Sequence, residues 1–95
     1  MTAENAFEAL TLFDPELARS LAEARPPDAP PLPEPILAEM ASTIFLAFET
    51  AFRLGTAVAD GYRTLLEGAA PQAVAVFSRD IRQACRRSAA LGEHL

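Results

Sequence analysis

The sequence predicts an all-α protein organised around a long antiparallel helical hairpin. Apolar and small residues recur at helical spacing from residue 37 to residue 65 without interruption. Six of the eight prolines lie between residues 26 and 35, so they interrupt the chain at one place. With 95 residues, of which 51% are hydrophobic, the chain is long enough for one small domain and too apolar to be wholly disordered.

Residues 1–25 are predicted to form an acidic arm that carries a short helix over residues 14–25. Asp14 is a suitable N-cap, because its carboxylate accepts hydrogen bonds from the unpaired amides of the first turn. Pro15 suits the first helical position. Pro26 ends the helix, because it disfavours helical geometry in the residue before it.

A second short helix is favoured at the start of the arm. Phe7, Leu10 and Phe13 recur every three residues, which favours a frayed helix over residues 3–12. A helix of about eleven residues is marginal alone in water. The arm therefore needs a surface to dock on.

Residues 26–35 are predicted to be a proline-rich linker between the arm and a helical hairpin domain over residues 36–95. An extended polyproline segment of this length spans roughly 30 Å. Its run of residues 30–33 (Pro-Pro-Leu-Pro) also fits a ligand for a proline-reading domain, which is the alternative to a stiff spacer.

Residues 36–67 are predicted to form one continuous helix, about 48 Å long at 1.5 Å per residue. Its apolar seam alternates spacings of four and three residues over four heptads, which is the pattern of a coiled coil. Neighbouring positions are apolar too, so the helix needs cover on two sides. On the opposite face, Glu49 and Arg53 are expected to form an ion pair. The seam residues are Leu37, Ala41, Ile44, Phe48, Ala51, Gly55, Val58, Tyr62 and Leu65.

Small residues along this helix indicate close packing. Ala47, Ala51, Gly55 and Ala59 lie four residues apart and form a ridge that another helix can approach closely. Gly55 and Gly61 each cost about 1 kcal/mol of helix propensity. Close packing is the expected compensation, and a kink is the alternative.

Gly68 suits the end of the long helix, and Pro71 begins a second helix predicted over residues 71–91. The turn between them is short, so the two helices are expected to pack antiparallel. The second helix is about 30 Å long and covers only about two-thirds of the first. The uncovered apolar side chains are Ile36, Met40, Ile44, Phe45, Phe48 and Phe52.

Three kinds of cover are available for this uncovered end. The arm can fold back and contribute Phe7, Leu10 and Phe13. A second copy can complete a four-helix bundle, and this dimer is the favoured interpretation. A larger protein or an apolar surface is the third. Where a second copy or a larger protein is the cover, alanine at both Phe48 and Phe52 is expected to abolish assembly.

Basic side chains gather near the C-terminus. Residues 69–95 hold four arginines and two acids, whereas residues 1–35 hold two arginines and seven acids. The arginines are interpreted as a solvated helix face, as a docking site for the acidic arm, or as a site for an anion, an acidic partner or nucleic acid. The net charge of −5 makes nucleic acid unlikely. The four arginines are Arg79, Arg82, Arg86 and Arg87.

No constellation in the sequence predicts catalysis, a metal or a cofactor. There is no glycine-rich phosphate loop and no nucleophile elbow. The single cysteine, Cys85, is expected to be a small buried thiol, with a reactive thiol as the alternative. The single histidine, His94, lies beyond a predicted helix stop at Gly92, so no Cys–His dyad is expected.

The sequence therefore predicts a non-enzymatic helical interaction or oligomerisation module, an accessory or adaptor protein that binds itself or a larger protein. The absence of lysine and the twenty alanines suggest a GC-rich, bacterial coding sequence. No signal peptide and no run long enough to cross a membrane are recognisable, so a cytoplasmic location is expected. A small regulator that binds an acidic partner or nucleic acid through the arginines is an alternative.

A further alternative comes from a resemblance. In its general sequence pattern, the stretch from Phe45 to Leu66 resembles the helices of phasins, the proteins of polyhydroxyalkanoate granules. The resemblance covers about a quarter of the chain and includes no specific motif. It implies an amphipathic coat that binds an apolar granule surface without catalysis.

Overall fold

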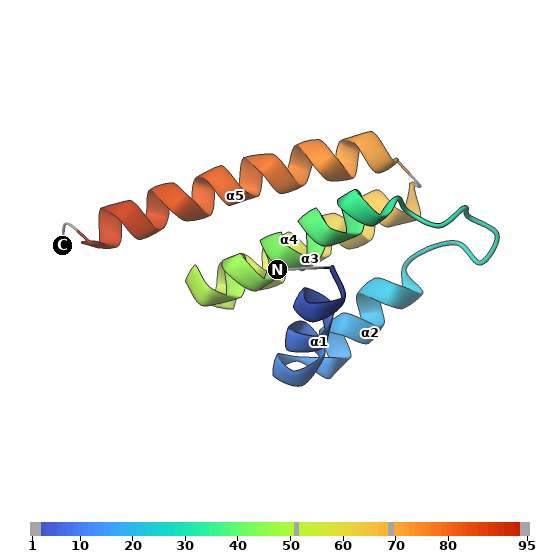
Figure 1. The fold of residues 1–95 in the computed structure, drawn as a ribbon, viewed down its shortest axis with the longest axis horizontal. Coiled ribbons are helices and arrows are strands. Elements are labelled where there is room, and N and C mark those ends of the chain that lie inside the picture. Colours follow the sequence, from blue (N-terminus) through green and yellow to red (C-terminus); the bar gives the residue numbers. More distant parts are fainter. Residues whose placement is uncertain (1–2, 51, 69, 94–95) are drawn as a thin grey trace.

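The computed structural model describes residues 3–50, 52–68 and 70–93, with side chains described between residues 8 and 88 of those ranges. Five helices and no strand occupy these residues, which confirms the predicted all-α class (Figure 1). The helices are α1 (Ala3–Phe13), α2 (Pro15–Glu23), α3 (Glu34–Thr50), α4 (Phe52–Glu67) and α5 (Pro71–Glu93).

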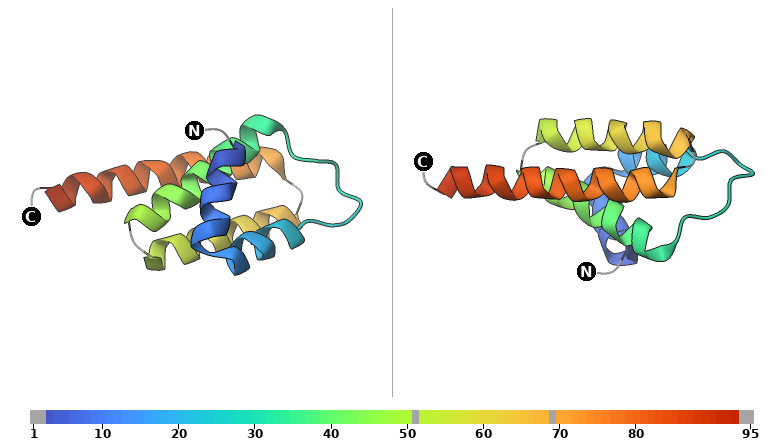
Figure 2. Two further views of the ribbon diagram at one scale, coloured as in Figure 1. Left: turned by 60° about the horizontal axis from the view of Figure 1, so that its bottom comes forward. Right: turned by 90° about the horizontal axis from the view of Figure 1, so that it is seen from above.

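Helix α3 is the centre of the bundle. It packs against α1, α4 and α5, while α2 packs on α1 and α4. Helix α4 runs antiparallel to α3, and α5 runs in the same direction as α3 (Figure 2). Helices α1 and α2 lie on the side of the bundle opposite α5 (Figure 1). The molecule measures 48 × 27 × 22 Å, because the last turns of α5 extend past the other helices (Figure 2).

The predicted N-cap at Asp14 is confirmed. Its Oδ1 accepts a hydrogen bond from the Leu17 N–H at 3.1 Å, and Pro15 occupies the first turn of α2. The Asp14 N–H donates to the Leu10 carbonyl at 2.7 Å, so α1 turns into α2 with one residue between them. Leu10 and Leu21 are each 1% exposed, which attaches both short helices to the core.

The segment between α2 and α3 turns instead of running straight. The Ala29 N–H donates to the Pro26 carbonyl at 3.1 Å, and the Arg25 side chain donates to the Pro30 carbonyl. Leu32 is only 7% exposed and belongs to the hydrophobic core. The leucine of the proline-rich run is therefore buried within this chain.

The prediction of one continuous helix over residues 36–67 is wrong. Helix α3 ends at Thr50 and α4 begins at Phe52, and the two pack side by side in opposite directions (Figure 2). The break lies at residue 51, outside the described residues. Seam residues on both sides of the break nevertheless share one core: Ala41, Ile44, Val58 and Tyr62 are at most 1% exposed.

Tertiary packing explains the break. A straight helix would leave its N-terminal half beyond the reach of α5, whereas α3 and α4 side by side cover one another. The stability of helices in proteins comes mainly from such packing. The local sequence favours a continuous helix only weakly. The Thr50 hydroxyl donates to the Leu46 carbonyl at 2.9 Å, which slightly destabilises a helix. Gly55, just after the break, lowers helix propensity.

Close packing at the two internal glycines is confirmed. A Cβ atom added at Gly55 would lie 2.9 Å from Cδ1 of Phe48, which is on α3. A Cβ atom added at Gly61 would lie 3.0 Å from Cε1 of Phe77, which is on α5. Each glycine therefore allows a neighbouring helix to place an aromatic ring against the backbone of α4.

The turn before α5 follows the prediction, and α5 contacts α4, the second half of the predicted long helix, in the expected antiparallel direction (Figure 2). The Gly68 N–H donates to the Leu65 carbonyl at 3.1 Å, and Pro71 begins α5. Helix α5 continues to Glu93, two residues past the predicted end. Because the chain reverses between α3 and α4, α5 lies parallel to α3 instead of antiparallel to one long helix (Figure 2). Cys85 of α5 is fully buried, as predicted.

Candidate interaction surfaces

The predicted interface residues separate into a buried group and an exposed group. Met40 and Ile44 are at most 2% exposed, and Leu10 of the arm is buried with them in the same core. Helix α1 packs on α3, so the arm supplies the cover that the sequence left open among three alternatives. In this structure the three residues belong to the core of the chain itself.

The remaining predicted interface residues lie nearer the surface. Phe13 is 61% exposed and Phe52 is 63% exposed. Ile36, Phe45 and Phe48 are partly buried. The Phe7 side chain lies outside the described residues.

Three of these phenylalanines form one exposed cluster, which we call the aromatic patch: Phe13, Phe48 and Phe52. The ring centroids of Phe13 and Phe48 are 5.2 Å apart at 57°, and those of Phe48 and Phe52 are 5.7 Å apart at 53°. Such tilted contacts are favourable geometries for aromatic rings. The patch joins the end of α1, the end of α3 and the start of α4.

A small cavity and two charged residues border the aromatic patch. The cavity has a volume of about 130 Å³ and is lined by Leu10, Phe13, Phe45, Phe48 and Glu49. Glu49 and Arg53 are both exposed. Their predicted ion pair is not formed, because the chain breaks between α3 and α4 and removes the helical spacing.

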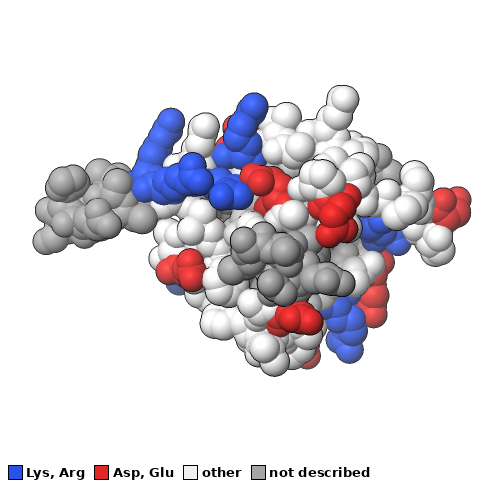
Figure 3. Space-filling view, viewed as in Figure 1, with Lys and Arg blue, Asp and Glu red and all other residues white. Residues whose placement is uncertain are grey.

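The arginines of α5 lie far from the arm. Helices α1 and α2 pack on α3, on α4 and on each other, and within the described residues neither contacts α5. Docking of the acidic arm on these arginines is therefore not observed there. Arg82 instead pairs with Glu39 of α3 at 3.1 Å, whereas Arg79, Arg86 and Arg87 are exposed. Basic side chains gather along α5 on this face of the molecule (Figure 3).

Two adjoining grooves run along the contact between α3 and α5. The first has a volume of about 290 Å³ and is lined by Glu39, Arg79, Arg82, Gln83 and Arg86. The second has a volume of about 410 Å³ and is lined by Pro35, Ile36, Glu39, Ala75, Val76 and Arg79. Basic side chains dominate the first groove and apolar side chains dominate the second. The two grooves share Glu39 and Arg79, so they form one continuous surface.

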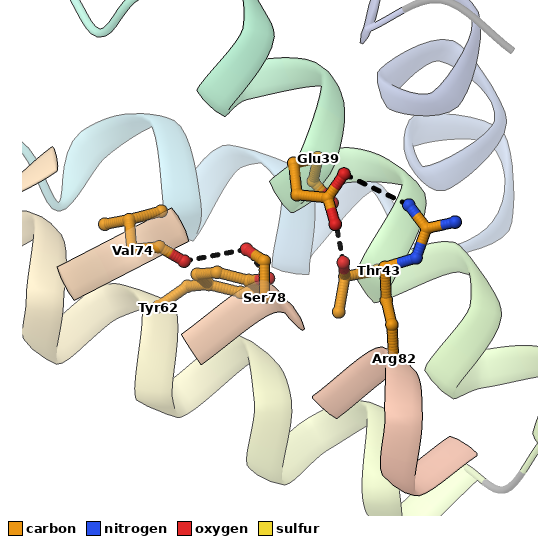
Figure 4. Close-up of polar contacts among 6 residues, drawn as sticks. All are labelled: Glu39, Thr43, Tyr62, Val74, Ser78 and Arg82. Carbon is orange, nitrogen blue, oxygen red and sulfur yellow. Dashed lines mark hydrogen bonds and ion pairs between the residues drawn. The ribbon is translucent and has the colours of Figure 1, made fainter. Parts of the chain in front are cut away.

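Buried hydroxyl groups of α3, α4 and α5 form hydrogen bonds in the core (Figure 4). The Ser78 hydroxyl donates to the Val74 carbonyl at 2.8 Å. Because that bond uses the only hydroxyl hydrogen of Ser78, the Tyr62 hydroxyl donates to Ser78 Oγ. Nearby, the buried Thr43 hydroxyl donates to the Glu39 carbonyl at 2.6 Å.

Burial raises the pKa of Tyr62 above its ordinary value of 10.0, because the core disfavours the phenolate. The neighbouring hydroxyls of Ser78 and Thr43 lower the pKa, because they can stabilise a phenolate, and Glu39 and Arg82 contribute smaller, opposing charge effects. Tyr62 is thus a neutral hydrogen-bond donor in the core at physiological pH. The heptad pattern predicts Tyr62 on the seam but does not predict Ser78 as its hydrogen-bond partner. The one available signal is that Ser78 lies four residues after the seam residue Val74, on the same face of the helix.

The described residues contain no group of three or more His, Cys, Asp or Glu side chains arranged to hold a metal ion. Among the same residues, no helix has the length and apolar character needed to cross a membrane. The fold and these surfaces define an all-α, five-helix protein with an exposed aromatic patch and an arginine-lined groove. Compared with known proteins, the chain matches no family model, no curated protein and no solved structure.

Proposed function

We propose that the protein is a non-enzymatic helical interaction module that pairs with a second copy through the aromatic patch. The observation that carries the proposal is the exposure of Phe13 (61%) and Phe52 (63%) in contact with a shared neighbour, Phe48. Burying one such side chain is worth about 1.5–3 kcal/mol relative to leaving it in water. A contact that removes both rings from water is therefore favourable.

The charges beside the patch support a second copy as the occupant. Glu49 and Arg53 carry opposite charges, and neither takes part in an ion pair within the described residues. In a two-fold interface, a contact from residue i of one copy to residue j of the other is matched by a contact from residue j of the first copy to residue i of the second. Glu49 of each copy can then face Arg53 of the other, while the phenylalanines meet near the axis.

The centre of the patch is already fixed before pairing. The Phe48 ring is seated against Gly55, so it loses little freedom when another ring packs on it. The patch is small beside a standard interface of about 800 Å² per partner. We therefore expect a weak, concentration-dependent dimer.

The first experiment measures molar mass by light scattering on a sizing column over a concentration series. The wild-type mass is expected to rise from 10.2 kDa towards twice that value. The double variant Phe13→Ser/Phe52→Ser is expected to stay monomeric with unchanged helical circular dichroism, because both side chains are exposed. Val76→Ser is the matched control, since it removes an exposed apolar side chain from α5. A monomeric wild type, or a double variant that still dimerises, would overturn the proposal.

Charge reversal tests the two-fold arrangement separately. Glu49→Arg alone and Arg53→Glu alone each place like charges across the interface, and each is expected to weaken pairing. The combined variant Glu49→Arg/Arg53→Glu restores opposite charges and is expected to restore the dimer. Equal effects of the single and combined variants would contradict this arrangement.

The exposed side chains also favour a second candidate, an amphipathic coat on an apolar granule. Leu12 is 87% exposed beside Phe13 on the last turn of α1, where both side chains can enter an apolar phase. This candidate requires wild-type protein to partition onto oil droplets and the Phe13→Ser/Phe52→Ser variant to stay in solution. Partition together with a monomeric mass in solution would favour the coat over the dimer.

A further inference from the structure

We propose that the continuous groove between α3 and α5 binds an acidic amphipathic helix of another protein. This inference concerns a surface separate from the aromatic patch and does not depend on the dimer. It follows from three features of the groove: helical spacing of its exposed residues, unpaired positive charge at one end, and apolar surface at the other.

The outer face of α5 presents a regular stripe. Its residues are separated by four, three, four and three positions, which is the heptad spacing that allows two helices to lie along one another. Every residue of the stripe is exposed, although this spacing is typical of a buried seam. The stripe residues are Gln72, Val76, Arg79, Gln83 and Arg86.

Positive charge is concentrated at one end of the groove. Arg79, Arg82 and Arg86 line it together with a single acid, Glu39. Arg82 is paired with Glu39 at 3.1 Å, which leaves the guanidinium groups of Arg79 and Arg86 without an ion-pair partner in the described part of the chain. Arg79 and Arg86 lie seven residues apart, two helical turns, on the same face of α5. A partner helix with carboxylates seven residues apart matches them.

The other end of the groove is apolar. Ile36 and Ala75 line it, and Val76 remains 48% exposed there. A partner helix that places an apolar residue against Val76 would reach Arg79 three residues later and Arg86 ten residues later along α5. The distance from Val76 to Arg86 is about 15 Å at 1.5 Å per residue, so a partner of three to four turns spans the groove.

The same features favour a protein helix over nucleic acid. The Glu39 carboxylate lies inside the basic part of the groove, so a continuous row of phosphates would meet it, whereas a helix can place single carboxylates opposite Arg79 and Arg86 only. The apolar end has no counterpart in a phosphate backbone. An acidic amphipathic helix satisfies both ends at once, by charge at one end and burial at the other.

The test uses fluorescence anisotropy with three labelled probes at physiological salt. The first probe is a synthetic 21-residue helical peptide with leucine at one seam position and glutamate three and ten residues further along. The second has the same composition with these residues moved to different faces of the helix. The third is a 20-nucleotide DNA duplex. We expect the first peptide to bind at least about tenfold more tightly than either other probe.

Variants locate the contact on this chain. Arg79→Glu/Arg86→Glu is expected to weaken binding of the first peptide by about tenfold or more, because it replaces two attractions with repulsions. Val76→Ser is expected to weaken it several-fold. Arg87→Glu is the matched control: it reverses an exposed arginine of α5 that does not line the groove, and it should change affinity by less than about twofold.

Several outcomes would overturn the proposal. Equal binding of the two peptides would show attraction by charge alone. Tighter binding of the DNA duplex, insensitive to Val76→Ser, would identify a nucleic-acid surface instead. An effect of Arg87→Glu as large as that of the double variant would show that the groove is not the site.

Discussion

The ring of Phe77 on α5 occupies the space that a side chain at Gly61 on α4 would fill. A Cβ atom at Gly61 would lie 3.0 Å from Cε1 and 3.1 Å from Cε2 of that ring. The same ring meets the neighbouring Tyr62 edge-on, with centroids 5.1 Å apart and planes at 83°. The contact between α4 and α5 therefore depends on residue 61 having no side chain.

Gly61→Ala is expected to destabilise the protein by about 1 kcal/mol. The alanine gains about 1 kcal/mol of helix propensity, but overpacking against the Phe77 ring costs about 1–3 kcal/mol. Urea unfolding followed by circular dichroism measures the difference. In a Phe77→Leu background, where the ring is absent, Gly61→Ala is expected to be neutral or stabilising. A Gly61→Ala protein more stable than wild type would contradict the argument.

Gly55→Ala provides a second case. The added Cβ atom would lie 2.9 Å from Cδ1 and 3.0 Å from Cγ of Phe48. These atoms are at the base of the ring, so a small side-chain shift does not move them away, and Phe48 is partly buried like Phe77. Gly55→Ala is therefore expected to cost about as much in urea unfolding as Gly61→Ala, and a much smaller cost would show that the Phe48 ring can move towards solvent.

Local signals in the sequence were sufficient to predict the short helices and the starts of α2 and α5, although α2 ends at Glu23 and not at residue 25. The carboxylate of Asp14 caps α2, and Pro71 begins α5, because capping and proline geometry act within a single turn. Five seam residues of the long predicted helix are buried as expected, whereas Leu37, Phe48 and Leu65 are only partly buried. Ala41 and Val58, on opposite sides of the break, are both buried.

The break between α3 and α4 could not be predicted from such signals. A heptad seam is the same whether a helix continues or folds back on itself, provided that both halves face one core. No proline lies between Thr50 and Phe52 to mark the reversal. The position of Phe52 beside Phe48 at the surface follows from the same event, because the end of α3 and the start of α4 meet there only when the chain reverses.

The hydrogen-bonded hydroxyl groups in the core predict unequal effects of two conservative substitutions. Tyr62→Phe removes the donor, but Ser78 keeps its hydrogen bond to the Val74 carbonyl, so a cost of about 1 kcal/mol is expected. Ser78→Ala leaves the buried Tyr62 hydroxyl without its acceptor, and about 1–3 kcal/mol is expected. Urea unfolding compares the two variants.

The double variant Tyr62→Phe/Ser78→Ala supplies the control. With both hydroxyls removed, no donor is left unsatisfied, so the total cost is expected to be smaller than the sum of the single costs. Strict additivity of the three values would indicate that the two hydroxyls do not interact.

The raised pKa of Tyr62 predicts a loss of stability in alkali. Above pH 10 the unfolded tyrosine releases its proton while the buried one retains it, so the unfolded state binds fewer protons and stability falls as pH rises. The contribution is fully present below pH 10 and is lost as pH rises through the folded-state pKa. Urea unfolding of wild type and Tyr62→Phe at pH 8 and pH 10.5 measures it.

The comparison between the two proteins isolates this one group. The free energy of unfolding of wild type is expected to fall more between the two pH values than that of Tyr62→Phe. All other ionisable groups are the same in the two proteins, so their effects cancel in the comparison. Parallel pH profiles would contradict a buried, neutral Tyr62.

The ion pair between Glu39 and Arg82 predicts a modest, salt-sensitive effect. It joins α3 to α5 at 3.1 Å, but the two side chains are 37% and 30% exposed, so solvent screens much of the attraction. Arg82→Gln is therefore expected to cost about 0.5–1 kcal/mol in urea unfolding at low salt, and less in 1 M salt.

Arg79→Gln is the control for this prediction, because Arg79 lies one turn earlier on α5 without an ion-pair partner. It is expected to change stability by less than about 0.5 kcal/mol. The charge-exchanged variant Glu39→Arg/Arg82→Glu is expected to recover part of the loss, since it rebuilds the pair in reverse. If Arg79→Gln cost as much as Arg82→Gln, the general positive charge of α5 would be responsible. The specific link from Arg82 to Glu39 would then contribute nothing.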